Sequence, residues 1–162
     1  FGILNAGRYG GELTYMPYRR DELILIAPQG HPLTAQTRVR MREALAYDFV
    51  GAHTGSAING VLTRSAAQLD LPLKLRIQVT SYDALCLMVA AGLGVGVLPR
   101  QSAALYQGSL PIQALRLDEP WAQRELVLCL RHYASLPPVA RALVDHLVAP
   151  ASGAPEGPGL IP

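Results

Sequence analysis

The chain has little of several residue types that would point to one chemistry or compartment. Only two of its 162 residues are cysteines, Cys86 and Cys129, and both lie inside apolar runs. Such settings favour buried, reduced thiols, which suit a reducing cytoplasm. Charged residues make up 16% of the chain, and 14 basic and 12 acidic side chains leave a formal net charge of +2. This balance argues against nucleic acid or an anionic membrane as a direct partner.

Long apolar runs and targeting segments are missing as well. No run approaches the roughly 18 residues of a membrane-spanning helix, and no secretory signal is visible. The chain opens with "FGILNAG", without Met, and residues 1–4 look like a strand already under way. We therefore expect a piece of a longer polypeptide. Half of the residues are hydrophobic, enough to bury a sizeable core in one domain or two small lobes.

What the sequence does contain is an alternation of strand and helix patterns, which predicts an α/β fold. Strands are expected at 22–28, 47–52, 73–80, 95–99, 112–117 and 124–131, and helices at 40–46, 56–69, 81–91, 100–107 and 136–148. The run at 22–28 is continuously apolar, as in a strand buried on both faces of a parallel sheet. Val139, Leu143 and Leu147 form the apolar stripe expected for the last helix. Residues 149–162 are rich in Pro and Gly and predict a disordered tail.

Three glycines stand two residues apart in "AAGLGVGVLPRQS", at Gly92, Gly94 and Gly96. A dinucleotide-binding loop runs from strand to glycines to helix. Here the order is helix, glycines, strand, so no helix N-terminus stands behind the loop to bind phosphate. We predict instead that Gly92 ends a helix in a left-handed conformation, and that Gly94 and Gly96 let a buried strand approach its neighbours closely.

Catalytic and metal-binding patterns are not found. The four histidines lack metal-ligand spacing with one another or with cysteine. The segment "HTGSA" lacks the second glycine of a nucleophile elbow. We therefore expect no catalytic residue, no metal and no cofactor. His53 precedes a helix start; a structural role is preferred for it, with a ligand contact as the alternative.

Two helix starts that follow strands carry hydroxyl side chains: Thr54 and Ser56 in one, Thr80 and Ser81 in the other. In parallel α/β units the carboxyl ends of strands and the N-termini of the following helices line ligand crevices. Free backbone N–H groups at those positions favour anions. Helix capping alone would explain any single one of these residues. The two starts together leave both interpretations open, capping alone or a pocket for a small anion or carboxylate.

The order of these features resembles the effector-binding domain of LysR-type transcriptional regulators. The two most specific stretches are "PQGHPL", which fits a P-x-x-H-P-L pattern, and "AAGLGVGVLP". The other matching stretches are "FGIL", "REALAYDFVGAHTGSAINGVL", "LRIQVTSYDAL" and "RELVLCLRHYASLPPVARALVDHL". Together they extend over nearly all of residues 1–148.

The resemblance implies a periplasmic binding protein type 2-like fold of two α/β lobes, joined by two crossover strands, with the effector between the lobes. Residues 1–15 would be the end of lobe I and the first crossover. Residues 16–99 would be lobe II, and 100–148 the second crossover and the rest of lobe I, with the first lobe incomplete at its N-terminus. The positions implied to contact effector are Asn5, Thr54, Gly55, Ser56, Thr80 and Ser81.

Family members carry a winged helix-turn-helix and a linker helix before this region. The resemblance thus implies a cytoplasmic regulator that binds a small anionic metabolite and reaches DNA only through the absent N-terminal domain. It also implies self-association as a dimer or tetramer, for which helix 56–69 is a candidate face, and no membrane partner. A free-standing solute-binding protein is the alternative, with an enzyme on this fold third. The reduced-looking cysteines count against secretion, and the missing nucleophile, metal set and paired carboxylates count against an enzyme.

Overall fold

The computed structural model describes residues 1–6 and 13–148, so the predicted tail at 149–162 lies outside the described residues. The chain divides into two compact units. Unit 1 comprises Phe1–Arg20 and Glu125–Pro162, and unit 2 is Asp21–Arg124. Of the helices in the described part of the chain, none has the length and apolar character needed to span a membrane.

The observed elements follow the predicted alternation of strands and helices closely. The strands are β1 (Gly2–Asn5), β2 (Thr14–Pro28), β3 (Arg38–Val39), β4 (Phe49–Ala52), β5 (Leu75–Val79), β6 (Val95–Pro99), β7 (Ile112–Leu117) and β8 (Gln123–Leu130). The α-helices are α1 (Met41–Ala44), α2 (Ala57–Gln68), α3 (Tyr82–Ala90), α4 (Arg100–Ala104) and α5 (Pro138–Val148). Short 3-10 turns lie at Pro32–Ala35, Pro120–Ala122 and Tyr133–Ser135. The main difference is β2, which begins at Thr14 and not at residue 22.

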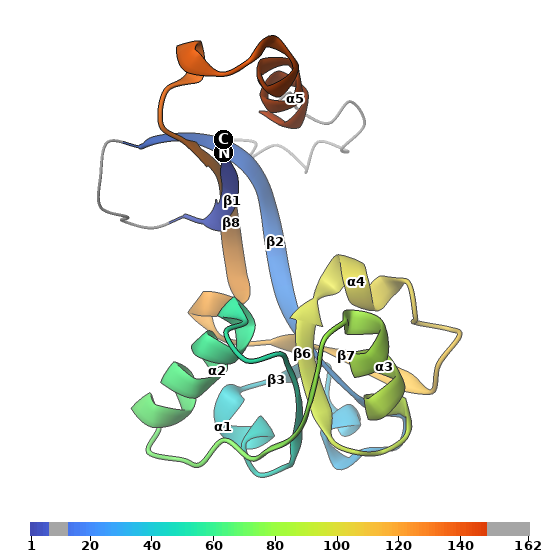
Figure 1. Cartoon of the computed structure of the whole chain (residues 1–162). Helices are drawn as coiled ribbons and strands as arrows, with labels where there is room; N and C mark the ends of the chain where they lie inside the picture. Colours follow the sequence, from blue (N-terminus) through green and yellow to red (C-terminus); the bar gives the residue numbers. More distant parts are fainter. Residues whose placement is uncertain (7–12, 149–162) are drawn as a thin grey trace, which may run out of the picture. The chain divides into compact units, whose positions relative to one another are not determined.

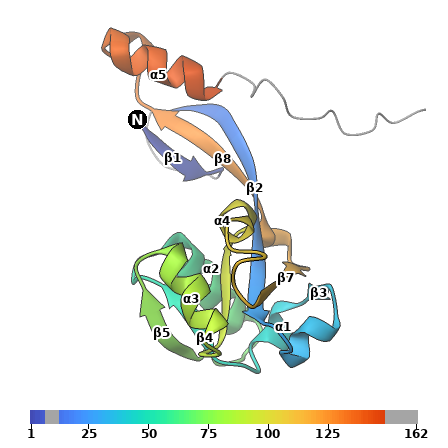
Figure 2. The same cartoon turned by 90° about the vertical axis from the view of Figure 1, so that its right-hand side faces the viewer.

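Unit 2 is a mixed sheet in the order β3-β7-β2-β6-β4-β5 (Figures 1 and 2). Strand β4 is parallel to both β5 and β6, whereas β2 is antiparallel to β6 and β7. The expectation that the 22–28 strand lies in a parallel environment is therefore wrong. Its continuous apolar run is still explained, because Leu23 to Ala27 are buried on both faces whatever the strand direction.

The bounds of unit 2 also differ from the predicted second lobe of 16–99. Strand β7 pairs with β2 and β3, which brings residues well beyond 99 into the sheet of this unit. The sequence pattern identified β7 as a strand, but strand pairing is a long-range property that the pattern does not report. Residues 112–117 therefore lie in unit 2, whereas the sequence analysis assigned them to the part of the chain after the second lobe.

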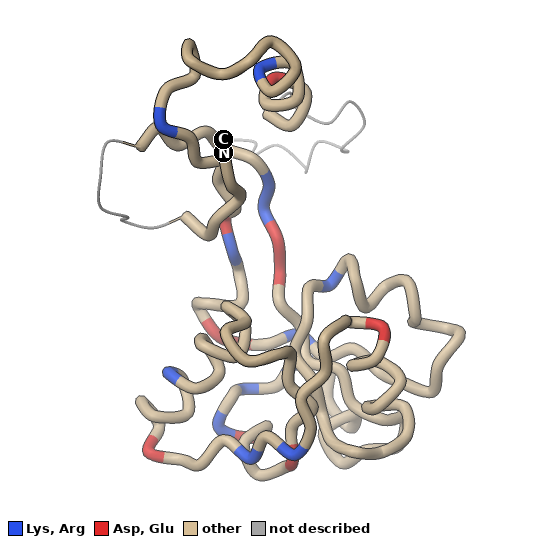
Figure 3. The backbone as a smooth tube through the Cα atoms, in the orientation of Figure 1, with Lys and Arg blue, Asp and Glu red and all other residues tan. Residues whose placement is uncertain are grey.

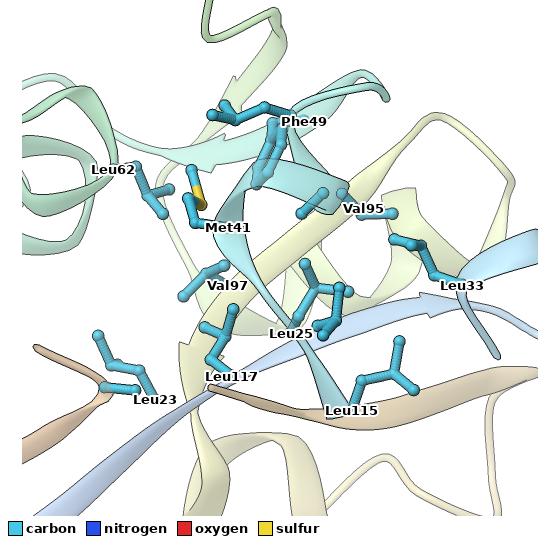
Figure 4. Close-up of a cluster of buried hydrophobic side chains, with 14 of the residues drawn as sticks. Leu23, Leu25, Leu33, Met41, Phe49, Leu62, Val95, Val97, Leu115 and Leu117 are labelled. Atoms are coloured by element: carbon cyan, nitrogen blue, oxygen red, sulfur yellow. The ribbon is translucent and has the colours of Figure 1, made fainter. Parts of the chain in front are cut away.

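Two hydrophobic clusters cover the two faces of this sheet. One face packs against α1 and α2, with Met41, Phe49 and Leu62 among its buried side chains (Figure 4). The other face packs against α3 and α4, with Leu85 and Val89 in its core. The sheet of unit 2 is therefore covered by helices on both faces, with α2 on one face and α3 on the other, as in other α/β units.

The glycine segment before β6 behaves as predicted. Gly92 follows α3 with φ of 79°, the left-handed conformation expected at a helix end. Gly94 has φ of 148°, and a Cβ there would lie 2.5 Å from the backbone oxygen of Asp48. A Cβ on Gly96 would lie 2.6 Å from the Cδ2 atom of Leu85. The glycines thus serve close backbone packing.

Unit 1 is built from β1, the first part of β2, most of β8, and α5. Strand β1 is antiparallel to β8, with Asn5 opposite Leu126. The core of unit 1 is small and contains Leu128, Leu130 and Val144. The predicted stripe of α5 is therefore wrong in part, since Val139 is 83% exposed and Leu143 is also exposed.

The error has a simple geometric cause. The helix presents Val144, Leu147 and Val148 to the strands, and this face is rotated from the one that the regular spacing of Val139 and Leu143 suggests. Both faces of α5 carry apolar side chains, so periodicity alone selects the wrong one.

Candidate functional site

A small cleft lies at the carboxyl ends of β4 and β5, inside unit 2. The two strands are parallel neighbours with Ala52 opposite Val79 (Figure 2), so the segments that follow them meet at one edge of the sheet. Each segment leads directly into a helix start, of α2 and of α3. The cleft has a volume of about 180 Å³ and is lined by Ala52, His53, Ser56, Thr80, Ser81 and Tyr82.

The two serines in the cleft cap the two helices. Ser56 precedes α2, and its Oγ accepts a hydrogen bond of 3.3 Å from the backbone N–H of Ile58. Ser81 precedes α3, and its Oγ accepts one of 3.2 Å from the N–H of Ala84. Capping uses an oxygen lone pair and leaves the hydroxyl proton free to donate. The capping interpretation is confirmed for both serines, and capping does not exclude a ligand contact by the same hydroxyls.

Thr80 has a different environment from the two serines. It follows the last residue of β5, is exposed, and its hydroxyl makes no hydrogen bond within the described residues. Together with Ser56 and Ser81 it gives the cleft three O–H groups that can donate. Such a set suits a ligand rich in acceptor oxygens, such as a carboxylate or a phosphate.

A buried asparagine holds the first of these helix starts against the sheet. Asn59, on the first turn of α2, is 7% exposed. Its Oδ1 accepts from the N–H of Ala52 at 3.2 Å, and its Nδ2 donates to the Ala52 carbonyl at 2.5 Å. A Cβ on Gly51 would lie 2.7 Å from the Cδ2 atom of Leu75 and 3.2 Å from that Oδ1, so the glycine leaves room for both side chains. Sequence analysis missed Asn59, although an Asn between Ile58 and Leu62 on the buried face of a helix was a usable signal.

The remaining predicted positions do not line the cleft. Thr54 is exposed, and its Oγ1 donates to the Oε1 of Gln78 at 3.1 Å. Gly55 forms the turn before α2 with φ of 87°. Asn5 is the last residue of β1 and belongs to unit 1. The structure therefore brings together three of the six predicted residues, and adds His53 and Tyr82, which sequence analysis did not select.

The lining of the cleft carries no Lys, Arg, Asp or Glu among the described residues. Its two titratable side chains are His53 and Tyr82. Burial is the largest cause acting on Tyr82 and raises its pKa, while the charge of Arg124 lowers that pKa and the charge of Asp21 raises it. Charge elsewhere is mixed, since basic and acidic segments alternate along the described backbone of unit 2 (Figure 3). Neutral donors thus define the cleft.

Neither metal-binding nor thiol chemistry is indicated. No three His, Cys, Asp or Glu side chains in residues 1–6 and 13–148 gather as a metal site would require. Cys86 lies on the buried face of α3, and burial raises its pKa to about 11 with a further contribution from Asp83. A thiol with so high a pKa is a poor nucleophile near neutral pH. Cys129 is buried as well, as predicted.

A doubly covered α/β sheet with a small cleft at adjacent strand ends is an arrangement typical of domains that bind small molecules. The family model for the LysR substrate binding domain matches residues 1–151, and the chain belongs to this family. The periplasmic binding protein type 2-like fold predicted for it is confirmed by solved LysR regulatory domains.

Curated relatives are transcriptional regulators. A probable RuBisCO transcriptional regulator of Trichormus variabilis is 30% identical over 106 residues, which are 61% of this chain and 32% of that protein. The HTH-type transcriptional activator CmpR of Synechocystis is 21% identical over 132 residues, 82% of this chain and 43% of CmpR. The chain thus spans between about a third and under half of these proteins.

Solved structures show the same fold at low identity. The CcmR regulatory domain of Synechocystis, in complex with 2-PG, matches with a TM-score of 0.78 and 20% identity over 91% of this chain and 71% of that one. The effector-binding domain of QuiR, in complex with shikimate, matches with a TM-score of 0.75 and 17% identity over 90% of this chain and 68% of that one. At such identities these likenesses establish the fold alone.

Proposed function

We propose that the chain is the effector-sensing domain of a LysR-type transcription regulator, and that its ligand is a small anionic metabolite bound in the cleft of Ser56, Thr80 and Ser81. The observation that carries the proposal is the convergence of three hydroxyl donors at two helix N-termini in one cleft. Hydroxyl protons and the positive ends of helices both favour oxyanions. We expect no enzymatic activity, since within the described residues neither Ser56 nor Ser81 is hydrogen-bonded to His53, and the cleft has no pair of carboxylates.

The rest of the predicted organisation belongs to this proposal. Unit 2 would be the second lobe and unit 1 part of the first, in a cytoplasmic protein that reaches DNA through a separate helix-turn-helix domain. Effector binding would alter DNA binding only as far as the effector prefers one arrangement of the regulator over another. We also propose that the chain self-associates as a dimer or tetramer, with α2 as the candidate face. Size-exclusion chromatography with light scattering, applied to the wild-type chain and to Arg64→Glu on the surface of α2, tests this.

A free-standing solute-binding protein of the same fold is less well supported. The curated relatives that match the chain carry names of transcriptional regulators and not of transport proteins. Shikimate and 2-PG, bound by the structural neighbours, are both acidic and guide the choice of probes.

The experiment is a thermal-shift panel with inorganic phosphate, sulfate, acetate, succinate, 2-phosphoglycolate and shikimate. We expect at least one of these anions to raise the melting temperature in a saturable way, while neutral glycerol does not. If none of the acidic compounds stabilises the folded chain, the anion-binding assignment is overturned.

Thr80→Val is the cleanest variant to combine with the panel, because it removes a hydroxyl that has no internal partner and keeps the side-chain shape. We expect it to weaken binding of the effective anion roughly ten- to a hundredfold, the loss of one hydrogen bond to a charged group. Thr63→Val, on the exposed face of α2, is the matched control and should change nothing. Ser56→Ala should also weaken binding, with an added loss of stability from the missing cap.

Asn5, Thr54 and Gly55 stay predictions. Asn5→Ala and Thr54→Ala, measured with the same anion, test them individually. Unchanged affinity in both would restrict the site to the residues that line the cleft.

A further inference from the structure

A part-buried ion pair joins the two ends of unit 2. Asp21 is the first residue of the unit and Arg124 the last, and an Nη of Arg124 donates to an Oδ of Asp21. Asp21 lies in β2 and Arg124 in β8, so the pair ties together the two strands by which the backbone enters and leaves the unit.

This pair is far better shielded from solvent than an ordinary surface ion pair. The Arg124 and Asp21 side chains are 14% and 11% exposed, compared with 56% and 44% for Arg76 and Asp48 in another pair of the same unit. Salt and water screen a shielded pair weakly, and the loss of one partner leaves an uncompensated buried charge. The pair therefore constrains backbone geometry in a way that exposed pairs do not.

The pair is also incompletely satisfied. The Nε of Arg124 is buried and has no hydrogen-bond partner within the described residues. A buried donor without an acceptor raises the free energy of the folded state, because its hydrogen bonds to water are lost and not replaced. An arrangement that gives this donor an acceptor is therefore more stable. The pair thus has a physical reason to change its geometry when its surroundings change.

Tyr82 is the candidate link between this pair and the cleft. Tyr82 lines the cleft and also packs against the core cluster that contains Leu23 and Ala122, each two residues from a member of the ion pair. The charges of Arg124 and Asp21 act in opposite directions on the pKa of the Tyr82 phenol. A ligand that moves Tyr82 alters the environment of the pair.

We propose that the Asp21–Arg124 pair couples the cleft to β2 and β8, so that a small anion in the cleft changes the order of these strands around residues 18–22 and 123–127. The inference rests on the proposed function, because it requires an anion in the cleft. It assigns positioning roles to Asp21, Arg124 and Tyr82 and predicts which backbone segments report binding.

The test is hydrogen exchange of the whole chain by mass spectrometry, with and without saturating inorganic phosphate, or succinate where phosphate gives no thermal shift. In the wild-type chain we expect exchange at 18–22 and 123–127 to change about fivefold, the lower range of measured couplings between sites. Asp21→Asn and Arg124→Gln should still bind the probe within about threefold of wild type and lose this exchange response. Arg76→Gln, which breaks the exposed pair with Asp48, should keep it.

Two double variants keep the test decisive if a single uncompensated charge prevents folding. The reciprocal exchange Asp21→Arg with Arg124→Asp restores an ion pair and should keep the exchange response. The neutral combination Asp21→Asn with Arg124→Gln should fold and lose it.

The outcomes separate this inference from the proposed function. A response of wild-type size in the neutral combination overturns the inference, and so does a wild-type chain that binds the probe with no change at 18–22 and 123–127. A wild-type chain that binds no anion at all fails the proposed function first, and overturns the inference with it.

Discussion

Replacement of Asn59 by Ala should destabilise unit 2 more than its small size suggests. The side chain makes two hydrogen bonds to one buried residue, accepting from the N–H of Ala52 and donating to its carbonyl. Loss of both leaves two backbone groups without that partner, at roughly 1 to 2 kcal/mol each. The higher helix propensity of Ala returns about 0.5 kcal/mol. We therefore expect a net loss of about 2 to 3 kcal/mol in the free energy of unfolding.

The assay is urea unfolding of the wild-type chain, Asn59→Ala and a control, Thr63→Ala, on the exposed face of the same helix. With a slope of about 2 kcal/mol per molar urea, the midpoint of Asn59→Ala should fall by roughly 1 to 1.5 M with the slope unchanged. Thr63→Ala should stay within about 0.5 kcal/mol of wild type. A loss below about 0.5 kcal/mol for Asn59→Ala would refute the role of these two bonds.

A second substitution at the same position separates the donor from the acceptor. Asn59→Asp keeps an oxygen for the Ala52 N–H, but at neutral pH it has no donor for the Ala52 carbonyl and brings a charge into a buried site. It should therefore be at least as destabilising as Asn59→Ala at pH 7. Part of the loss should return as the pH falls below the carboxyl pKa, because the protonated acid can donate again.

Three further predictions follow from local geometry. Gly94→Ala should cost more than about 3 kcal/mol, because strain at positive φ is joined by a backbone clash, whereas Gly92→Ala should cost only about 1 kcal/mol; equal losses in urea unfolding would contradict this. In a Cys129→Ser variant, Cys86 should react with a thiol reagent at pH 8 only after unfolding. A pKa of about 11 leaves about one thiol in a thousand as the reactive thiolate at that pH. Rapid labelling of the folded chain would contradict this prediction. The hydrogen bond from Arg100 lowers the pKa of Glu22 from its usual 4.5, so the wild-type chain should be more stable than Glu22→Gln at pH 7. This difference in stability should disappear as the pH falls through the lowered pKa. A constant difference at pH 7, 5 and 3 would refute the prediction.

Much of the secondary structure was predictable because it depends on local patterns. The apolar runs at β4, β6 and β7 and the caps at Ser56 and Ser81 act over a few residues, and the predicted strands and helices are observed there. The Gly92 helix end is equally local. The direction of β2 and the inner face of α5 were predicted wrongly. A strand buried on both faces has the same apolar pattern in parallel and antiparallel pairing, and α5 carries apolar residues on two faces.

The candidate site was predictable in part for the same reason. Ser56, Thr80 and Ser81 follow from a rule about strand ends and helix starts, and they meet in one cleft because β4 and β5 are adjacent and parallel. Tyr82 looked like an ordinary helix residue. Asn59 acts on a strand seven positions earlier, through bonds that appear only when helix and sheet pack.

The sequence by itself determined the order of strands and helices, the hydroxyl groups at two helix starts and the family to which the chain belongs. These depend on neighbouring residues and on short motifs. Only the tertiary structure decided the strand order of the sheet, the extent of unit 2 and the pairing of Asp21 with Arg124. Each of these features joins residues that are far apart in the chain. The packing of a shared core brings such residues together and limits the access of water to them.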